Sequence, residues 1–287
     1  MALLSVSALA CSSPPGDPPI PLPSPNPLGT GSRIRDLTPP AGGDKADGIP
    51  KNPNHPSQNA NVDVTGVVVT ATDLFDETKD GKSLGTIYVQ DVGSPPLPFS
   101  GIDLYSASFL PGTYHAAPGD VVDLTGPYQD YAGPSTGFPI GKLPELAKPL
   151  GSFRYEYSVP APVPINIADL EVTDVDHFVK GSQWLGMLVT VKNVALTISG
   201  TCTPMPPATT CPVLTNDGKG RVSAPLTSDA SSGPAVVNEL YDLKATDFAV
   251  AAGKSSLPLA SVTGIVTFFF NFHIAPRSAA DIVVATP

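Results

Sequence analysis

The chain has 287 residues and a formal net charge of −10 at pH 7, with 35 Pro, 26 Gly and 41% hydrophobic residues. So much Pro and Gly excludes an architecture of long helices, while the hydrophobic fraction is too high for a wholly disordered chain. No apolar run reaches the roughly 18 to 20 residues that a membrane-spanning helix needs. The composition therefore predicts an all-β protein with one large or two small domains.

The charge is unevenly distributed along the chain. Residues 1–61 carry four basic and four acidic residues, residues 62–165 carry five basic and twelve acidic ones, and residues 166–287 carry seven and ten. A surface that binds phosphates needs clustered Lys or Arg, and no segment has such a cluster. The charge therefore disfavours nucleic acid as a partner.

The first eleven residues, 1–11, are typical of a signal peptide that ends at a lipidation site. The run MALLSVSALA precedes Cys11, and a Ser/Pro-rich stretch follows it. Ala8 and Ala10 suit the narrow pocket of a signal peptidase, although Leu9 is large for this motif and no Lys or Arg precedes the run. We expect an exported lipoprotein, anchored through Cys11 in the bacterial cell envelope at the outer membrane or cell surface. The alternatives are a plain signal peptide and an unrelated frayed terminus.

The two other cysteines, Cys202 and Cys211, enclose a short Pro/Thr-rich segment, CTPMPPATTC. An even pair in an exported protein normally forms a disulfide. A metal site would need further Cys or His ligands nearby, and the segment has none. We predict a Cys202–Cys211 disulfide in a surface loop of the second module.

Residues 12–61 are dominated by Pro, Gly, Ser, Asn and Asp. Such a segment buries too little apolar surface to offset its ordering entropy, so we predict a disordered Pro-rich linker that acts as a tether. Only the short motif SRIRDLTPP could dock, as a strand. His55 is expected to be an exposed loop residue.

Residues 62–165 contain short β-branched stretches separated by turn signals, which favour a small closed or partly open barrel. The expected strands are residues 62–71, 84–91, 101–105, 119–131 and 150–159.

Residues 166–287 repeat this pattern after a helical or turn segment. The expected strands are residues 184–197, 218–226, 236–242 and 260–272. Both modules place Gly inside long strands, Gly66 with Gly186 and Gly126 with Gly264, which is typical of the bends of a small barrel. The sequence thus predicts two tandem small β-barrels, residues 62–165 and 166–287.

Several phrases carry a family resemblance. TGVVVTATD, GTIYVQDVG, SGIDLY and GDVVDLTG, with the closing VTGIVTFFFNFHIAPRSAADI, resemble the bacterial extracellular OB-fold modules of exported lipoproteins. Similar modules accompany secreted nucleases of the endonuclease/exonuclease/phosphatase type. The resemblance covers about residues 62–287 and implies two tandem small OB-like β-barrels. It is more specific for the fold than for the function.

Alternation in two predicted strands of the first module assigns side chains to faces. The inward set is Ile87, Val89, Ile102 and Leu104. The outward set, our candidate ligand face, is Tyr88, Gln90, Asp103 and Tyr105. OB barrels usually bind oligomers on this face, with aromatic rings as stacking platforms. The alternative is that the tyrosines cover the barrel or pack against the second module. Acidic Asp103 favours a sugar or protein over nucleic acid.

The same alternation places Phe268, Phe270 and Phe272 on one side of a strand, which predicts a core stripe. His273, on the other side, is expected to be structural or exposed. Trp184 could stack on a carbohydrate, but packing at a barrel mouth is the preferred interpretation.

The sequence holds no GxSxG, HExxH, P-loop or GxGxxG motif, and its four His residues are dispersed. The acidic loop near residues 76–80 does not match a calcium-loop spacing. We therefore expect a non-enzymatic binding or assembly module of the cell envelope, without metal or cofactor, for a protein or carbohydrate partner. The alternatives are an accessory nucleic-acid-binding module beside a separate secreted nuclease, and an unrecognised hydrolase.

Overall fold

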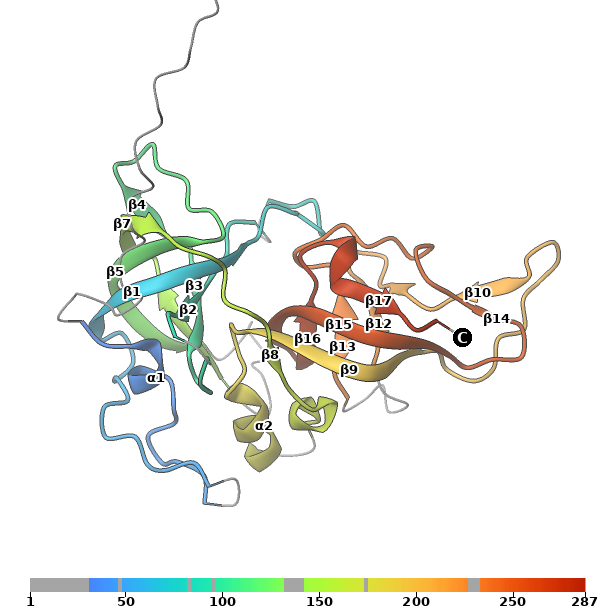
Figure 1. The fold of residues 1–287 in the computed structure, drawn as a ribbon, viewed down its shortest axis with the longest axis horizontal. Coiled ribbons are helices and arrows are strands. Elements are labelled where there is room, and N and C mark those ends of the chain that lie inside the picture. The colour runs from blue at the N-terminus through green and yellow to red at the C-terminus, as the bar shows by residue number, and fades with distance from the viewer. Residues whose placement is uncertain are drawn as a thin grey trace, which may run out of the picture.

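Over the residues that it describes, the computed structural model is almost entirely β, with two short α-helices (Figure 1). Residues 1–30 are outside the part of the chain that it describes, and with them the predicted lipidation site at Cys11. The described residues are 31–45, 48–81, 84–93, 96–131, 142–172, 175–226 and 233–286, without the side chains of 175–177. Among them, no helix is long and apolar enough to cross a membrane.

The first module is a closed five-stranded barrel. The sheet of this module has seven strands, of which five close the barrel. The seven strands are β1 (Asn61–Thr72), β2 (Ile87–Asp91), β3 (Gly101–Tyr105), β4 (Ser108–Leu110), β5 (Asp120–Tyr131), β6 (Leu143–Ala147) and β7 (Leu150–Glu156). Hydrogen bonding runs β1-β2-β3-β6-β5 and returns from β5 to β1, which is the OB strand order, while β7 and β4 extend the sheet. The predicted inward residues Ile87, Val89, Ile102 and Leu104 are buried in its core.

Strand β6, which closes the barrel, was not expected from the sequence. We predicted residues 150–159 as the closing strand, but these form β7, which pairs with β5 outside the closed circuit. The segment LPELA is short and contains Pro144, which cannot donate a ladder hydrogen bond, so its pattern does not read as a central strand. It nevertheless pairs with both β3 and β5 and buries Leu146 completely.

Strand β1 takes part in two pairings because it bends at Gly66. Its first half pairs with β5 and its second half with both β5 and β2, and the β5 register shifts between Val64 and Val67. Gly66 has φ of +67°, a conformation that suits glycine, and donates its N–H to the carboxylate of Asp123 at 2.8 Å. This bulge lets one strand close the barrel.

Residues from 31 to 60 dock on the first barrel, which corrects the prediction of a linker over 12–61 for this part. The helix α1 (Ile34–Leu37) buries both of its apolar residues in the barrel core. Asp91 accepts hydrogen bonds from the backbone N–H groups of Ile34 and Arg35 at 2.9 and 3.1 Å. Burial of an Ile and a Leu side chain contributes about 1.5–3 kcal/mol each, which is of the same order as the roughly 1–2 kcal/mol per residue that ordering the four residues of this helix costs.

His55, expected to be exposed, helps to hold this segment. Its Nδ1 lies 3.0 and 3.1 Å from the carbonyl oxygens of Leu37 and Pro39. Its Nε2 lies 3.3 Å from a carboxylate oxygen of Asp130, and its ring packs edge-on against Tyr128. The docked segment is therefore fastened to β5 as well as to the barrel core.

The second module has the same strand order but is partly open. Its elements are β8 (Val163–Pro164), η1 (Ile167–Leu170), α2 (Val175–Ser182), β9 (Leu188–Thr197), β10 (Thr210–Pro212), β11 (Thr215–Asn216), β12 (Val222–Pro225), β13 (Ala235–Val237), β14 (Ala249–Ala251), β15 (Ser256–Phe269), β16 (Asn271–Ala275), η2 (Ala279–Asp281) and β17 (Ile282–Val284). The order β12-β13-β16-β15-β9 repeats that of the first barrel. Among the described residues, β9 and β12 do not pair as a ladder. The predicted all-β fold of tandem OB-like modules is confirmed.

The predicted strand over 260–272 contains a turn. Phe270 has φ of +66° and separates β15 from β16, so that Phe268 faces Phe272 across the hairpin. These two rings are buried, as expected, but Phe270 is exposed at the tip. The predicted three-residue stripe is therefore wrong at Phe270, because the run of three Phe carries no Gly or Pro to signal a turn.

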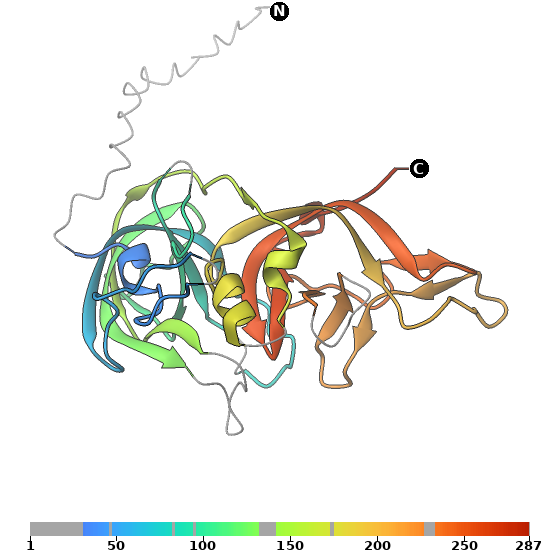
Figure 2. The same cartoon turned by 90° about the horizontal axis from the view of Figure 1, so that it is seen from below.

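A helix precedes and plugs the second module as α1 does the first. In both views α2 lies between the two modules (Figures 1 and 2). Its Phe178 contacts the rings of Phe268 and Phe272, with centroids 4.9 and 5.5 Å away. A Cβ on Gly181 would fall within 2.2 Å of the Phe272 ring, so glycine allows this close approach. Each repeated unit therefore includes the helix before its first long strand.

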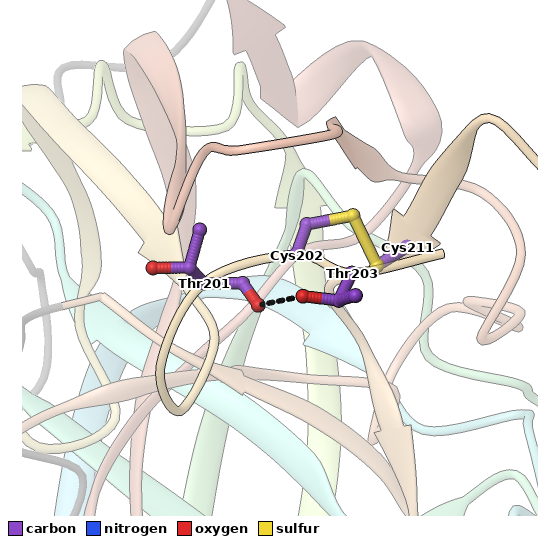
Figure 3. The surroundings of a disulfide bond; sticks show 4 residues. All are labelled: Thr201, Cys202, Thr203 and Cys211. Carbon is purple, nitrogen blue, oxygen red and sulfur yellow. Dashed lines mark hydrogen bonds between the residues drawn. A yellow bond between two sulfur atoms is a disulfide. The ribbon is translucent and has the colours of Figure 1, made fainter. Parts of the chain in front are cut away.

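The predicted disulfide between Cys202 and Cys211 is present (Figure 3). Cys211 lies on β10, which pairs with β14 in a two-stranded extension of the module. We expected the bond in a surface loop, but Cys202 is buried and belongs to the hydrophobic core of the second module. The bond thus joins the extension to the edge of that core.

Candidate functional site

The four residues of the predicted ligand face do share one side of β2 and β3, but the second module covers most of it. Tyr88 and Gln90 are buried, Asp103 is partly buried, and only Tyr105 is well exposed, at 52%. Tyr88 stands opposite Asp103 rather than opposite Tyr105. The prediction of one exposed face is therefore wrong for Tyr88 and Gln90, and the alternative of packing against the second module holds for both.

Two glycines allow the modules to approach at backbone distance. A Cβ on Gly101 would lie 2.5 Å from backbone atoms of Gly186 and Met187. The adjoining Phe99 N–H donates to the carbonyl of Gln183 at 2.7 Å. Any side chain at Gly101 would push the two backbones apart, so glycine is required for this contact.

Polar side chains bridge the same interface. The Tyr88 hydroxyl donates to Oε1 of Glu239 at 2.6 Å, and the Thr267 hydroxyl donates to Oε2 at 2.7 Å. Gln90 accepts a hydrogen bond from the backbone N–H of Leu188 at 3.2 Å through its side-chain oxygen. Glu239 therefore joins β2 of the first module to β15 of the second.

A cleft of about 660 Å³ lies beside this bridge and is lined by both modules. Its carboxyl groups belong to Asp73, Glu77, Asp103, Asp217 and Glu239, and its aromatic rings to Tyr88, Tyr131, Phe268 and Phe269. Arg221 supplies a positive charge, and the ring of His273 reaches the same space. The volume lies within the roughly 300–1,000 Å³ that is usual for small-molecule sites.

Two of these carboxyl groups hold protons far more tightly than usual. Burial raises the pKa of Asp73 to about 8, with smaller contributions from Glu239 and Glu77. Burial also raises the pKa of Asp103 well above its ordinary range, helped by Glu145 beside it on β6. Asp73 is therefore largely protonated at pH 7 and can donate as well as accept hydrogen bonds, and the pKa of Asp103 is shifted in the same direction.

Most of the remaining polar groups of the cleft are already engaged. The Arg221 guanidinium lies 3.7 Å from Glu77 and stacks 4.6 Å from the centre of the Phe269 ring. Asp217 accepts backbone hydrogen bonds from Lys219 and Arg221 within its own turn. The Asp103 carboxyl, in contrast, makes no hydrogen bond to any other described residue.

His273 contributes a neutral ring. Burial and, secondarily, the nearby Arg221 lower its pKa to about 4, so the imidazole is uncharged at neutral pH. Within the described parts of the chain, no group of three or more His, Cys, Asp or Glu side chains is arranged to hold a metal ion. The arrangement can therefore offer neutral hydrogen-bonding groups and aromatic surface to a ligand.

Trp184, considered as a carbohydrate-stacking residue, packs at the edge of the second core and is not part of the cleft lining. Sequence reasoning missed Asp73, Glu239, Arg221 and Thr267. Asp73 directly follows a predicted strand and Glu239 lies within one, but only the docking of the modules brings them together. No sequence pattern within one module predicts that these two residues lie close together.

Comparisons of the chain with protein-family models, with curated proteins and with solved structures find no match. The function must therefore be inferred from the cleft itself: its volume, the raised pKa of Asp73 and Asp103, and its aromatic walls.

Proposed function

We propose that this protein is a non-enzymatic binding module of the bacterial cell envelope and that the cleft between its modules is the ligand site. The observation that carries the proposal is a cleft of about 660 Å³ built by both modules. Its walls combine aromatic rings with a few polar groups, which is the usual composition of a small-molecule site. The backbone contact at Gly101 and Gly186 keeps these walls in fixed relation.

Two features support the envelope location. The Ala8-x-Ala10-Cys11 sequence after an apolar run fits lipid attachment at Cys11. The Cys202–Cys211 disulfide fits an oxidising compartment outside the cytoplasm. Mass spectrometry of the membrane fraction from the native host should then find an acylated Cys11 at the N-terminus, and a soluble chain that retains Met1 would contradict the anchor.

Filling the cleft tests the binding site. Ser223 lies on β12 and lines the cleft, and its hydroxyl makes no hydrogen bond to another described residue, so Ser223→Trp inserts a large ring without removing an interface contact. The matched control is Lys192→Trp, on the exposed side of β9 and outside the cleft. Both variants are first checked for an unchanged thermal unfolding midpoint.

A ligand panel of oligosaccharides, short peptides and single-stranded DNA is then measured by calorimetry against both variants and the native chain. We expect at least one ligand to lose tenfold or more affinity in Ser223→Trp and none in Lys192→Trp. The site is wrong if the panel yields no ligand, or if every ligand binds Ser223→Trp as tightly as the native chain. A ligand recovered in cleaved form would favour a hydrolase, and steep salt dependence with DNA would favour the nucleic-acid alternative.

A further inference from the structure

The carboxyl groups of the cleft outnumber its cationic groups. Five carboxyl groups line the cleft, together with the guanidinium of Arg221 and the imidazole of His273. The Arg221 guanidinium lies 3.7 Å from Glu77 and is therefore already paired. The carboxyl groups of the lining that form no ion pair with any described residue are those of Asp73, Asp103, Asp217 and Glu239.

Glu239 keeps a negative charge that its neighbours do not neutralise. The hydroxyl groups of Tyr88 and Thr267 donate to its two oxygens at 2.6 and 2.7 Å. Both oxygens therefore act as acceptors, as they do in an ionised carboxylate, and neither donor carries a charge. A cation bound in the cleft gains from this carboxylate, whereas an anion is repelled by it.

The carboxyl group of Asp73 has an acceptor atom that the protein leaves unused. Asp73 directly follows β1, lines the cleft and is only 3% exposed. Its Oδ1 accepts a hydrogen bond from the backbone N–H of Phe75 at 3.1 Å, but its Oδ2 has no hydrogen-bond partner among the described residues. Because an unsatisfied buried acceptor is costly, a ligand that donates to Oδ2 gains affinity without breaking a bond of the fold.

The pKa of Asp73 agrees with this arrangement. Burial is the largest cause of its rise to about 8, and the carboxyl groups of Glu239, Glu77 and Asp76 add to it. The unliganded chain therefore holds a proton where these acidic groups meet, and a cationic donor beside Oδ2 would take the place of that proton. A metal ion fits less well, because no three His, Cys, Asp or Glu side chains of the described residues are arranged to hold one.

We infer that the ligand of this cleft carries a primary ammonium group, which donates a hydrogen bond to Oδ2 of Asp73 and faces the carboxylate of Glu239. A primary ammonium group combines a positive charge with three N–H donors, so it meets both needs of the site. A lysine side chain of a short peptide and a free aliphatic amine both present this group. The inference rests on the proposed function, because it assigns a chemical class to the same cleft.

The first experiment separates the charge of the ligand from its N–H donors. The peptide probes are acetyl-Ala-Lys-Ala-amide and the same peptide with norleucine or trimethyllysine in place of Lys. The free-amine probes are butylamine, butanol and butyltrimethylammonium, and all are measured by calorimetry with the full chain at pH 7. Norleucine and butanol lack the charge, whereas the trimethylated probes keep the charge and lack the donors.

We expect the Lys peptide, butylamine or both to bind at least tenfold more tightly than their uncharged and trimethylated counterparts. Equal binding of the uncharged probe would show that no cation is recognised, and equal binding of the trimethylated probe would show that no hydrogen bond to Asp73 is needed. Either result would overturn the inference. Which of the two amines binds more tightly identifies a peptide or a free amine as the source of the group.

Variants that remove one carboxyl group assign the contacts. Asp73→Asn and Glu239→Gln keep the size of the side chain and should each weaken binding of the amine at least tenfold. Asp63→Asn makes the same change at an exposed position of β1 outside the cleft and should change the affinity less than twofold. Each variant is first checked for folding by its thermal unfolding midpoint, and Glu239→Gln decides if Asp73→Asn does not fold. A folded cleft variant that binds the amine within threefold of the native affinity would contradict the inference.

The Ser223→Trp variant separates the two possible failures. If no amine binds but another panel member binds the native chain and not Ser223→Trp, the cleft is the site and the amine class is wrong. If an amine binds the native chain and Ser223→Trp equally, the amine is held elsewhere and the proposed site itself fails.

Discussion

The first module closes its barrel, whereas the second, with the same strand order, remains open between β9 and β12. The difference lies in the first strand of each module. β1 shifts register at Gly66 and reaches both β5 and β2, while β9 keeps one constant register along β15. Closure therefore depends on a local bend rather than on strand order, and a module without that bend needs other means to hold its core.

Pairing registers also show where the two modules match. Gly126 faces Val62, and Gly264 faces Val189. Val62 and Val189 therefore hold matching positions in the two modules. Four residues after Val62 lies Gly66, and four residues after Val189 lies Asn193, which has φ of +54°. Asn193 therefore occupies the position of Gly66, and Gly186, which we had matched with Gly66, serves the contact between modules instead.

The largest expected effect concerns the helical plug that both modules share. Ile34→Ala should lower the free energy of unfolding by about 3 kcal/mol, because Ile34 is completely buried in the first core. Leu74→Ala is the control, since Leu74 is 82% exposed. Urea denaturation checks both, and an Ile34→Ala loss no larger than that of Leu74→Ala would show that the segment before β1 is not part of the module.

The disulfide distinguishes the open module from the closed one. Replacing Cys202 and Cys211 together with Ala should cost about 2–3 kcal/mol, because the bond closes a short loop and Cys202 is buried. Hydrogen exchange should accelerate in β10, β14 and the neighbouring core, while β1, β2 and β3 stay protected. Equal acceleration in both modules would mean that the bond supports the whole chain rather than the second module.

The contact between the modules can be broken by one methyl group. Gly101→Ala should cost about 2 kcal/mol, because its Cβ would overlap the backbone of Gly186. Gly93→Ala is the matched control, since a Cβ there meets nothing within 4 Å. Thermal unfolding measures both variants. Equal unfolding midpoints would show that the two modules do not approach each other closely at Gly101.

The smallest expected effect is a pH dependence of stability, in which the acid groups of the first module and the histidine of the second act with opposite signs. Asp73 binds its proton up to about pH 8 when folded but only to its ordinary pKa of 3.8 when unfolded, so stability falls as pH rises towards 8. Unfolded His273 loses its remaining proton just above its ordinary pKa of 6.5, so that histidine opposes the fall by only roughly 0.4 kcal/mol between pH 6.5 and 8. We expect a loss of about 1 to 2 kcal/mol between pH 6.5 and 8.

Asp73→Asn should remove the share of this slope that Asp73 contributes to the denaturation curves, while Asp103, whose pKa burial also raises, keeps a slope of the same sign. Glu145, whose pKa is raised to about 7 by burial, accounts for a residual slope of the same sign. His273 gives a pH dependence of the opposite sign. The stability that it contributes above pH 6.5 is lost as the pH falls through its folded pKa of about 4. An Asp73→Asn variant with the full native slope would contradict the assignment.

Much of the fold could be predicted from local pattern, because β-branched alternation marks strands such as β1 and β3 without reference to the rest of the chain. β6 and the turn at Phe270 could not be predicted in this way, since Pro144 and an unbroken Phe run conceal them.

The site was predictable only in part. Tyr88 and Asp103 share a face by alternation, but Asp73 and Glu239 join them only through docking, which depends on two glycines that look like ordinary strand glycines.

The central claim is that the two modules form one fixed unit with the cleft between them. Two backbone amides report on it directly, because the Phe99 N–H donates to Gln183 and the Leu188 N–H to the Gln90 side chain, each across the interface. Native-state hydrogen exchange by NMR should show both amides protected nearly as well as the central amides of β1 and β15. Exchange of both at the rate of exposed loop amides, with the strands still protected, would mean that the modules are not docked and that the cleft is not a fixed site.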